Sequence, residues 1–273
     1  SSPFAFTQVL EEVVVTAQIR EQSLQDVPIS VSAISGEDIA DRSVDNLQSL
    51  SASVPNFMVV ETQIDTSISI RGVRSGANKG FEQSVPLNFD GVVYPRSQLA
   101  RTPLVDLERV EVLRGPQPTL FGKNAIGGAV SVTSAKPTEE FEGKFSTSHE
   151  SEHGEDQSLL VLSGALSDNL LGRLTVSTRE MDGWITNTKM KRLEPQRDET
   201  YIRGQLAWTS GDVDYNLKVE TADFDSLGYA MEAIAPQDGY GLVFAGPIAV
   251  ETTENWVRSS GETFSQNTMD NFV

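Results

Sequence analysis

Few side chains in this chain could act as nucleophiles or as soft metal ligands. The 273 residues include no cysteine and two histidines, His149 and His153. The histidines fall at the end of an expected strand and in an acidic loop, where a spacing of four residues does not place them on one face. With only these two histidines, neither a Ser-His-Asp nor a Cys-His arrangement is credible, and the sequence contains no phosphate-binding G-x-x-x-x-G-K-[ST] loop. We therefore expect no catalytic residue, no metal site and no cofactor.

The acidic charge of the chain narrows the range of its partners. The formal net charge is −18 and the pI is about 4.4, so the surface repels phosphates and no nucleic-acid partner is expected. The carboxylates form either an ordinary solvated surface or the lumen or rim of a site for cationic or metal-bearing ligands. Composition does not choose between the two. No apolar run is long enough for a transmembrane helix, but the strands of a transmembrane barrel give only weak alternating signals.

The part before residue 137 has short elements separated by Gly/Pro turns. Asp90-Gly91 between apolar residues predicts a hairpin over 87–93. A capping-box pattern at Ser35 predicts one short helix, and the spacing of apolar residues predicts a second that starts near Ser43. Further strands are predicted at 28–34, 67–73, 107–113 and 129–133.

After residue 137 the chain changes to longer segments in which apolar and polar residues alternate. Strands of about ten residues, enough for a tilted membrane crossing, are predicted at 141–149, 157–166, 170–179, 200–209 and 213–222. A soluble sandwich would show the same two faces. However, short and long links alternate between the segments, as the turns and loops of transmembrane barrels do, and Trp208 and Tyr215 flank one tight turn where an aromatic girdle would lie. Residues 271–273 resemble the start of another strand. Five strands cannot close a barrel of this kind, so we expect it to be incomplete in this chain.

One long motif is specific enough to indicate a family. It runs from Asp106 to Gln117 (DLERVEVLRGPQ), continues over 120–130 (LFGKNAIGGAV) and ends at Lys136-Pro137. The motif closely resembles the plug-domain signature of TonB-dependent outer-membrane receptors, with Pro118 where Gly is common and Phe121 where Tyr is common. Shorter matches come in the family's order at 28–31, 55–57, 70–72 and 90–92. The resemblance implies an α+β plug domain, a small mixed sheet with short helices, inside the start of an antiparallel transmembrane β-barrel.

The composition change and the resemblance together predict an N-terminal segment (1–25), a plug domain (26–137) and the N-terminal part of the barrel with extracellular loops (138–273). The resemblance assigns plug-signature roles to Arg71, Gly72, Asp90, Gly91, Arg109, Glu111, Arg114, Gly115, Pro116, Gly122, Gly127 and Gly128. Arg71 and Arg114 pair either with acids inside the plug or, as the family implies, with carboxylates of the barrel wall beyond residue 273, because a buried arginine needs a partner.

A Val-rich stretch near the N-terminus would on sequence alone be an ordinary edge strand or one that pairs with a partner by β-augmentation. The resemblance favours coupling to TonB through the TonB-box-like residues Glu12, Val13, Val14, Val15, Thr16 and Ala17. It also implies ligand contact from outward plug loops, which could equally just pack on the barrel wall. The candidates there are Arg74, Asn78, Lys79, Phe81, Gln83, Tyr94 and Arg96.

The resemblance implies energy-coupled import of a scarce ligand across the bacterial outer membrane, with a ferric siderophore as the leading ligand. The expected partners are TonB with its inner-membrane motor complex, outer-membrane lipid and a small-molecule ligand such as an iron chelate, and the plug would be accessible from the periplasm. Other ligands of the family are haem, cobalamin and oligosaccharides. A ligand-sensing outer-membrane protein and a soluble all-β enzyme are the alternatives of other classes.

Overall fold

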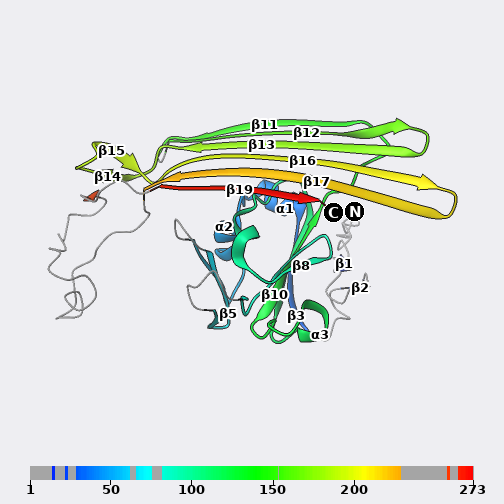
Figure 1. The fold of residues 1–273 in the computed structure, drawn as a ribbon, viewed down its shortest axis with the longest axis horizontal. Coiled ribbons are helices and arrows are strands. Elements are labelled where there is room, and N and C mark those ends of the chain that lie inside the picture. The colour runs from blue at the N-terminus through cyan, green and yellow to red at the C-terminus, as the bar shows by residue number, and fades with distance from the viewer. Residues whose placement is uncertain are drawn as a thin grey trace, which may run out of the picture. The chain divides into compact units, whose positions relative to one another are not determined.

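The chain divides into two compact units, the first ending at Ala135 and the second starting at Lys136, beside the predicted end of the plug at residue 137 (Figure 1). The computed structural model describes residues 14–15, 22–23, 29–61, 66–75, 82–152, 154–228, 257–258 and 264–272. None of the helices in these ranges is long and apolar enough to cross a membrane.

The first unit is an α+β arrangement of short elements. They are β1 (Val14–Val15), β2 (Gln22–Ser23), β3 (Ser30–Ser35), α1 (Gly36–Asp41), α2 (Leu47–Ser51), β4 (Phe57–Glu61), β5 (Thr66–Ile70), β6 (Val73–Arg74), β7 (Leu87–Phe89), β8 (Val92–Tyr94), the 3-10 helix η1 (Ser97–Arg101), β9 (Leu107–Arg114), α3 (Pro118–Phe121) and β10 (Gly128–Ser134). A five-stranded mixed sheet has the order β3-β9-β10-β7-β8, in which only β10 and β7 are parallel. Strands β4, β5 and β6 form a separate antiparallel sheet.

The core of this unit lies around the central strands β9 and β10. Val110, Val112 and Val130 are fully buried, and Leu113 and Phe121 cluster with two buried alanines. Such β-branched and apolar residues favour strands that are covered on both faces. The predicted strands at 107–113 and 129–133 are therefore confirmed.

Two turns in the first unit have the same left-handed backbone, and only one was predicted. The hairpin at Asp90-Gly91 is confirmed, with φ of 48° and 86° at these two residues. The strand predicted over 67–73 is confirmed only as far as Ile70, where β5 ends, and is wrong beyond it. Arg71 and Gly72 have φ of 51° and 79° and join β5 to β6 as a second hairpin. Positive φ at both central residues is the geometry that tight hairpins favour.

The short helices start where side chains cap them. Ser35 caps α1 and accepts a hydrogen bond from the Asp38 amide at 3.1 Å. The start predicted near Ser43 is wrong, because Ser43 has a φ of 52° and the helix begins four residues later. Asn46 caps it in a reciprocal capping box with Ser49.

The second unit is a six-stranded antiparallel sheet in the order β11-β12-β13-β16-β17-β19. Its strands are β11 (Glu142–Glu150), β12 (Glu155–Ser167), β13 (Leu170–Met181), β16 (Gln196–Ser210), β17 (Val213–Leu227) and β19 (Phe264–Phe272), and a small separate sheet holds β14 (Ile185–Asn187), β15 (Arg192–Glu194) and β18 (Val257–Arg258). The five predicted strands are confirmed, although β16 and β17 reach 15 residues each. The prediction that residues 271–273 start a strand is wrong, because Asn271 and Phe272 end β19.

Candidate functional sites

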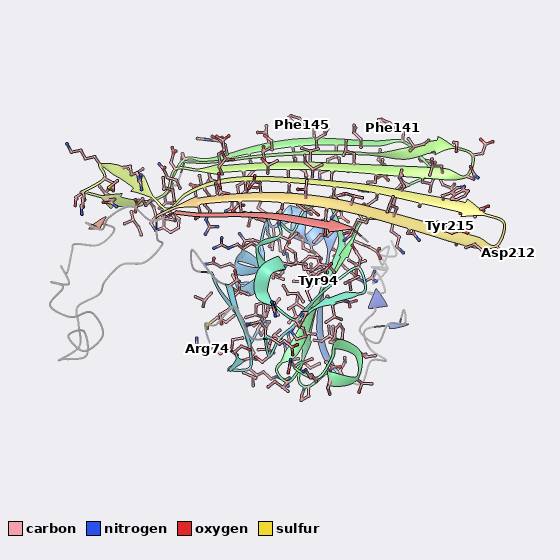
Figure 2. All side chains as sticks on the ribbon, viewed as in Figure 1. Arg74, Tyr94, Phe141, Phe145, Asp212 and Tyr215 are labelled. Carbon is pink, nitrogen blue, oxygen red and sulfur yellow. The ribbon has the colours of Figure 1, made fainter. Side chains whose placement is uncertain are left out.

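The large sheet of the second unit exposes its apolar face. Leu206 and Leu217 are 40% and 51% exposed, whereas Arg203 and Glu220 are 2% and 3% exposed. A water-soluble sheet has the reverse arrangement, with the apolar face inward. An apolar outer face and a polar inner face are the pattern of a barrel wall in a lipid bilayer. Figure 2 shows Phe145 of β11 and Phe141, which directly precedes this strand, projecting from the sheet.

Charged and polar side chains on the inner face of this sheet contact one another. Arg203 and Glu220 lie opposite each other on β16 and β17, and the Tyr201 hydroxyl donates to Glu220 Oε2 at 2.9 Å. Lys218 Nζ lies 3.4 Å from Glu220 Oε1. Buried charges need such pairing to offset their lost hydration. The alternating sequence predicted the shared face but did not single out this cluster as a site.

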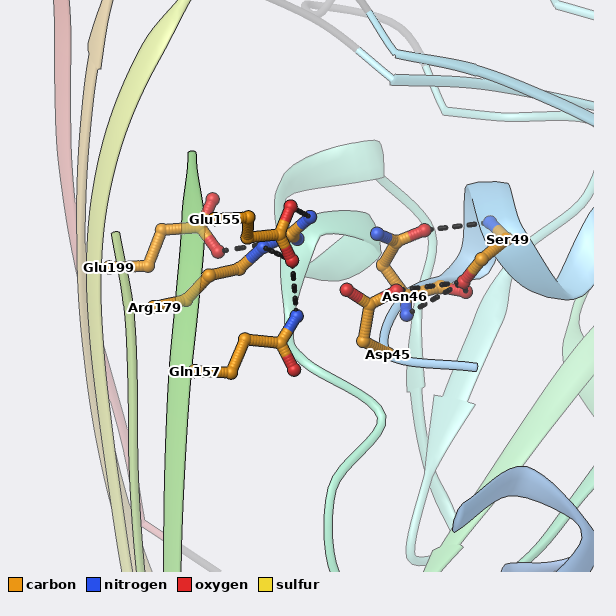
Figure 3. A network of polar contacts seen from close by, with 7 residues as sticks. All are labelled: Asp45, Asn46, Ser49, Glu155, Gln157, Arg179 and Glu199. Carbon is orange, nitrogen blue, oxygen red and sulfur yellow. Dashed lines mark hydrogen bonds and ion pairs between the residues drawn. The ribbon is translucent and has the colours of Figure 1, made fainter. Parts of the chain in front are cut away.

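A second inner-face network joins three neighbouring strands (Figure 3). Arg179 on β13 donates from Nε and Nη2 to the two carboxylate oxygens of Glu155, at 3.0 and 2.9 Å. Its Nη1 lies 3.9 Å from Glu199 Oε2, and Gln157 donates to Glu155. Such a bidentate ion pair offsets the two opposite charges and also favours one register of the neighbouring strands. The same figure shows the capping box of α2.

The plug-signature arginines differ in their partners. Arg109 Nε lies 3.1 Å from Oε1 of the fully buried Glu111. Arg114 instead donates to the Pro55 carbonyl at 3.2 Å and to the hydroxyls of Ser30 and Ser32. Partial burial, and then the nearby charge of Arg71, lower the pKa of the Arg114 guanidinium.

The sequence left two kinds of partner open for Arg71 and Arg114, acids inside the plug or carboxylates of the barrel wall. Within the described part of the plug, neither arginine takes part in an ion pair, so the internal salt bridge is not formed there. Pairing with barrel carboxylates stays a prediction.

The glycines and prolines of the motif close the connection between β9 and β10. The Gly115 amide donates to the Gly127 carbonyl at 3.1 Å, and Pro116 follows on the surface. Pro118 opens α3 at its first position, where a proline costs no hydrogen bond. Left-handed φ values occur at Gly115, Gly122 and Gly128. Asp90 links its own hairpin to the far end of β10, because its carboxylate accepts from the Ser134 amide and hydroxyl at 2.7 and 2.9 Å.

The TonB-box-like segment is described at two of its residues. Val14 and Val15 form β1, which pairs antiparallel with β2 (Val14 with Ser23, Val15 with Gln22). Among the described strands, β2 is the only neighbour of β1, so the second edge of β1 is not paired within this sheet. Its remaining residues, Glu12, Val13, Thr16 and Ala17, lie outside the described residues.

The four predicted ligand-binding residues that the structure describes, Arg74, Gln83, Tyr94 and Arg96, have different surroundings. Figure 2 shows Arg74 and Tyr94 apart on the plug, and the Tyr94 ring packs edge-on against Phe89 with centroids 6.2 Å apart. Arg96 is exposed, whereas Gln83 is buried. The backbone amide of Gln83 donates a hydrogen bond to the Pro95 carbonyl at 2.6 Å. Asn78, Lys79 and Phe81 lie outside the described residues.

One polar cluster of the plug was not predicted from the sequence. Glu82 accepts a hydrogen bond from the Asn124 side chain and lies 3.7 Å from Lys123 Nζ. Lys123 and Asn124 both belong to the GKN stretch of the long motif, and this stretch was the sequence signal that could have indicated the cluster.

The structure describes one of the two histidines, His149. His149 Nδ1 lies 2.8 Å from Asp156 Oδ1 on the neighbouring strand, and His153 lies outside the described residues. Among the residues that the structure places, no group of three or more His, Asp or Glu side chains could hold a metal ion.

Comparison with known proteins agrees with this architecture. Residues 23–129 match the TonB-dependent Receptor Plug Domain family. The chain is 33% identical over 189 residues to the iron-regulated outer membrane virulence protein of Vibrio cholerae, covering 64% of this chain and 28% of that protein. It is 30% identical over 162 residues to the pesticin receptor of Yersinia enterocolitica, covering 58% and 24%.

Solved structures give the same picture. The ferric yersiniabactin uptake receptor FyuA from Yersinia pestis matches with a TM-score of 0.65 and 25% identity, covering 73% of this chain and 32% of that one. The chain thus spans less than a third of the length of these relatives. Residues 23–129 thus match a plug domain of the TonB-dependent receptor type, and the large sheet that follows has the arrangement of a barrel wall whose apolar face meets lipid.

Proposed function

We propose that this chain belongs to a receptor that imports a ferric siderophore across the outer membrane, driven by TonB. The observation that carries the transport class is the exposed apolar face of the large sheet, in a chain that also matches a plug domain. The names of the relatives favour iron, since one is iron-regulated and another takes up ferric yersiniabactin. The receptor is not an enzyme, because its work is to bind and release a ligand.

TonB would engage the receptor at β1. A strand with an unpaired edge accepts an extended segment of a partner by main-chain hydrogen bonds. The energy for release then comes from the proton gradient through TonB and its inner-membrane motor complex. No step of this proposal requires a cofactor.

Cobalamin is the second candidate ligand. The chain is 28% identical over 189 residues to the vitamin B12 transporter BtuB of Vibrio vulnificus. That identity is lower than the 33% found with the iron-regulated protein over the same length, so the iron ligand leads.

Val15→Pro in the native receptor tests the proposal. Proline removes an amide from β1 and disfavours central pairing, so uptake of the ferric siderophore should fall to background while binding to whole cells is unchanged. Val15→Thr keeps the amide and the β-branched shape and serves as the matched control. Normal uptake by Val15→Pro would remove the coupling role of this strand. If a panel of substrates showed uptake of cobalamin but of no ferric siderophore, cobalamin would replace the ferric siderophore as the proposed ligand.

A further inference from the structure

The outer face of the barrel sheet contains an apolar groove. Its volume is about 460 Å³, within the range of small-molecule sites. Three glycines form its floor: Gly164 lies opposite Gly172 on the neighbouring strand, and Gly204 lies opposite Leu174. Its walls include Phe141, Leu166, Leu174, Leu206 and Leu217.

The groove is open at its centre. A Cβ built on Gly204 would meet no atom within 4 Å, whereas one on Gly172 would lie 2.8 Å from the Leu166 side chain. The φ of Gly204 is not in the left-handed region, so its backbone would accept a residue with a side chain such as leucine. The missing side chain at Gly204 therefore leaves space that neighbouring residues do not fill.

One end of the groove lies toward the end of the sheet where short turns join β12 to β13 and β16 to β17. Leu217, in the wall, is two residues along β17 from Tyr215, whose ring stacks on Trp208 with centroids 5.1 Å apart. Stacked Trp and Tyr rings on an apolar outer face mark the level of lipid head groups. Figure 2 places Tyr215 and Asp212 together at this end. In this family of barrels the short turns face the periplasm.

The charges at this end select among head groups. Residues 165–171 and 207–216 include three aspartates, Asp168, Asp212 and Asp214, and no lysine or arginine. All three aspartates are exposed. The one base that lines the groove, Arg173, is paired with Glu142, its Nη1 lying 3.3 Å from Oε2. The exposed carboxylates at this end therefore repel an anionic head group and attract an ammonium group.

We propose that the groove seats one acyl chain of a periplasmic-leaflet phospholipid whose head group carries a primary ammonium. This inference rests on the membrane location in the proposed function but not on any ligand of transport. The groove is continuous with the lipid-facing surface, so an acyl chain is the occupant that its surroundings supply. Lipid tails are as apolar as leucine, so the preference for the groove comes from close packing and from the head group.

Native mass spectrometry of the detergent-extracted receptor tests the proposal, with equal amounts of phosphatidylethanolamine and phosphatidylglycerol of the same acyl chains added. We expect one retained phosphatidylethanolamine per receptor. Gly204→Leu fills the groove and should lower that occupancy about tenfold. Thr178→Leu adds a leucine to the same face outside the groove and should leave the occupancy unchanged. Asp168→Asn with Asp212→Asn should keep the total lipid count but abolish the preference for ethanolamine.

Equal lipid occupancy in the wild type and in Gly204→Leu would overturn the proposal. So would a wild-type dimer or a bound protein that Gly204→Leu removes, because the groove would then seat a protein segment. Heat-modifiable migration on gels verifies that each variant has a folded barrel. Lipid occupancy is measured without transport, so a failed uptake assay and a failed lipid assay are independent results.

Discussion

A single added carbon at Gly128 should strongly destabilise the plug. A Cβ at this residue would lie 2.1 Å from the Leu113 carbonyl oxygen and 2.8 Å from Cδ1 of Ile70. The first neighbour is backbone of β9, in the ladder where Ala129 pairs with Leu113, so it cannot rotate away. The φ of Gly128 is 147°, which is also unfavourable for a residue with a side chain.

The free-energy cost of Gly128→Ala follows from these contacts. The backbone conformation costs about 1–3 kcal/mol, overpacking against Ile70 costs about 1–3 kcal/mol, and a weakened ladder bond costs about 1 kcal/mol. We therefore expect a local destabilisation of roughly 4 kcal/mol. Gly91→Ala is the matched control, because its φ of 86° is left-handed but a Cβ there meets nothing within 4 Å. It should cost only about 1–2 kcal/mol.

Hydrogen–deuterium exchange of the detergent-solubilised receptor measures both costs. Amides of β9 and β10 should exchange about a thousandfold faster in Gly128→Ala, since each 1.4 kcal/mol changes an equilibrium about tenfold. Amides of β7 and β8 should change by about tenfold in Gly91→Ala. Equal protection of β9 and β10 in the two variants would refute the reasoning, because steric overlap with the backbone would then carry no cost.

Two further predictions concern the same region. Arg109→Met leaves the buried Glu111 carboxylate without the guanidinium that lies 3.1 Å away and should destabilise the plug by about 3–5 kcal/mol. Arg109→Met combined with Glu111→Met should recover most of this lost stability in the same exchange experiment. No recovery would mean that Glu111 depends on other partners. Pro118→Gly at the first position of α3 should lower plug stability by about 0.5–1 kcal/mol through the freedom of the unfolded chain, as seen by denaturant titration, and an unchanged midpoint would show that the proline adds no rigidity.

The two hairpins of the plug show how far local chemistry predicts structure. Asp-Gly is a common pair for a tight turn, so Asp90-Gly91 was found from the sequence. Arg71-Gly72 adopts the same backbone, although arginine has no preference for a left-handed φ. Alternating apolar residues around it suggested an unbroken strand. The turn there depends on the Arg71 amide, which donates to the Asn56 carbonyl at 2.9 Å, a long-range contact that no local pattern contains.

The faces of the barrel strands show a different limit. The alternation of Leu206 and Trp208 with Arg203 and Gln205 separated two faces without saying which one is buried, since a sandwich and a barrel share this code. Burial decides it, because the arginine is enclosed and the leucine is exposed. Once the polar face is inside, its charges must be paired, and the Lys218–Glu220 and Arg179–Glu155 ion pairs help to meet that requirement. The same orientation places Gly204 on the outside, where a missing side chain forms a groove for lipid instead of a defect in a core.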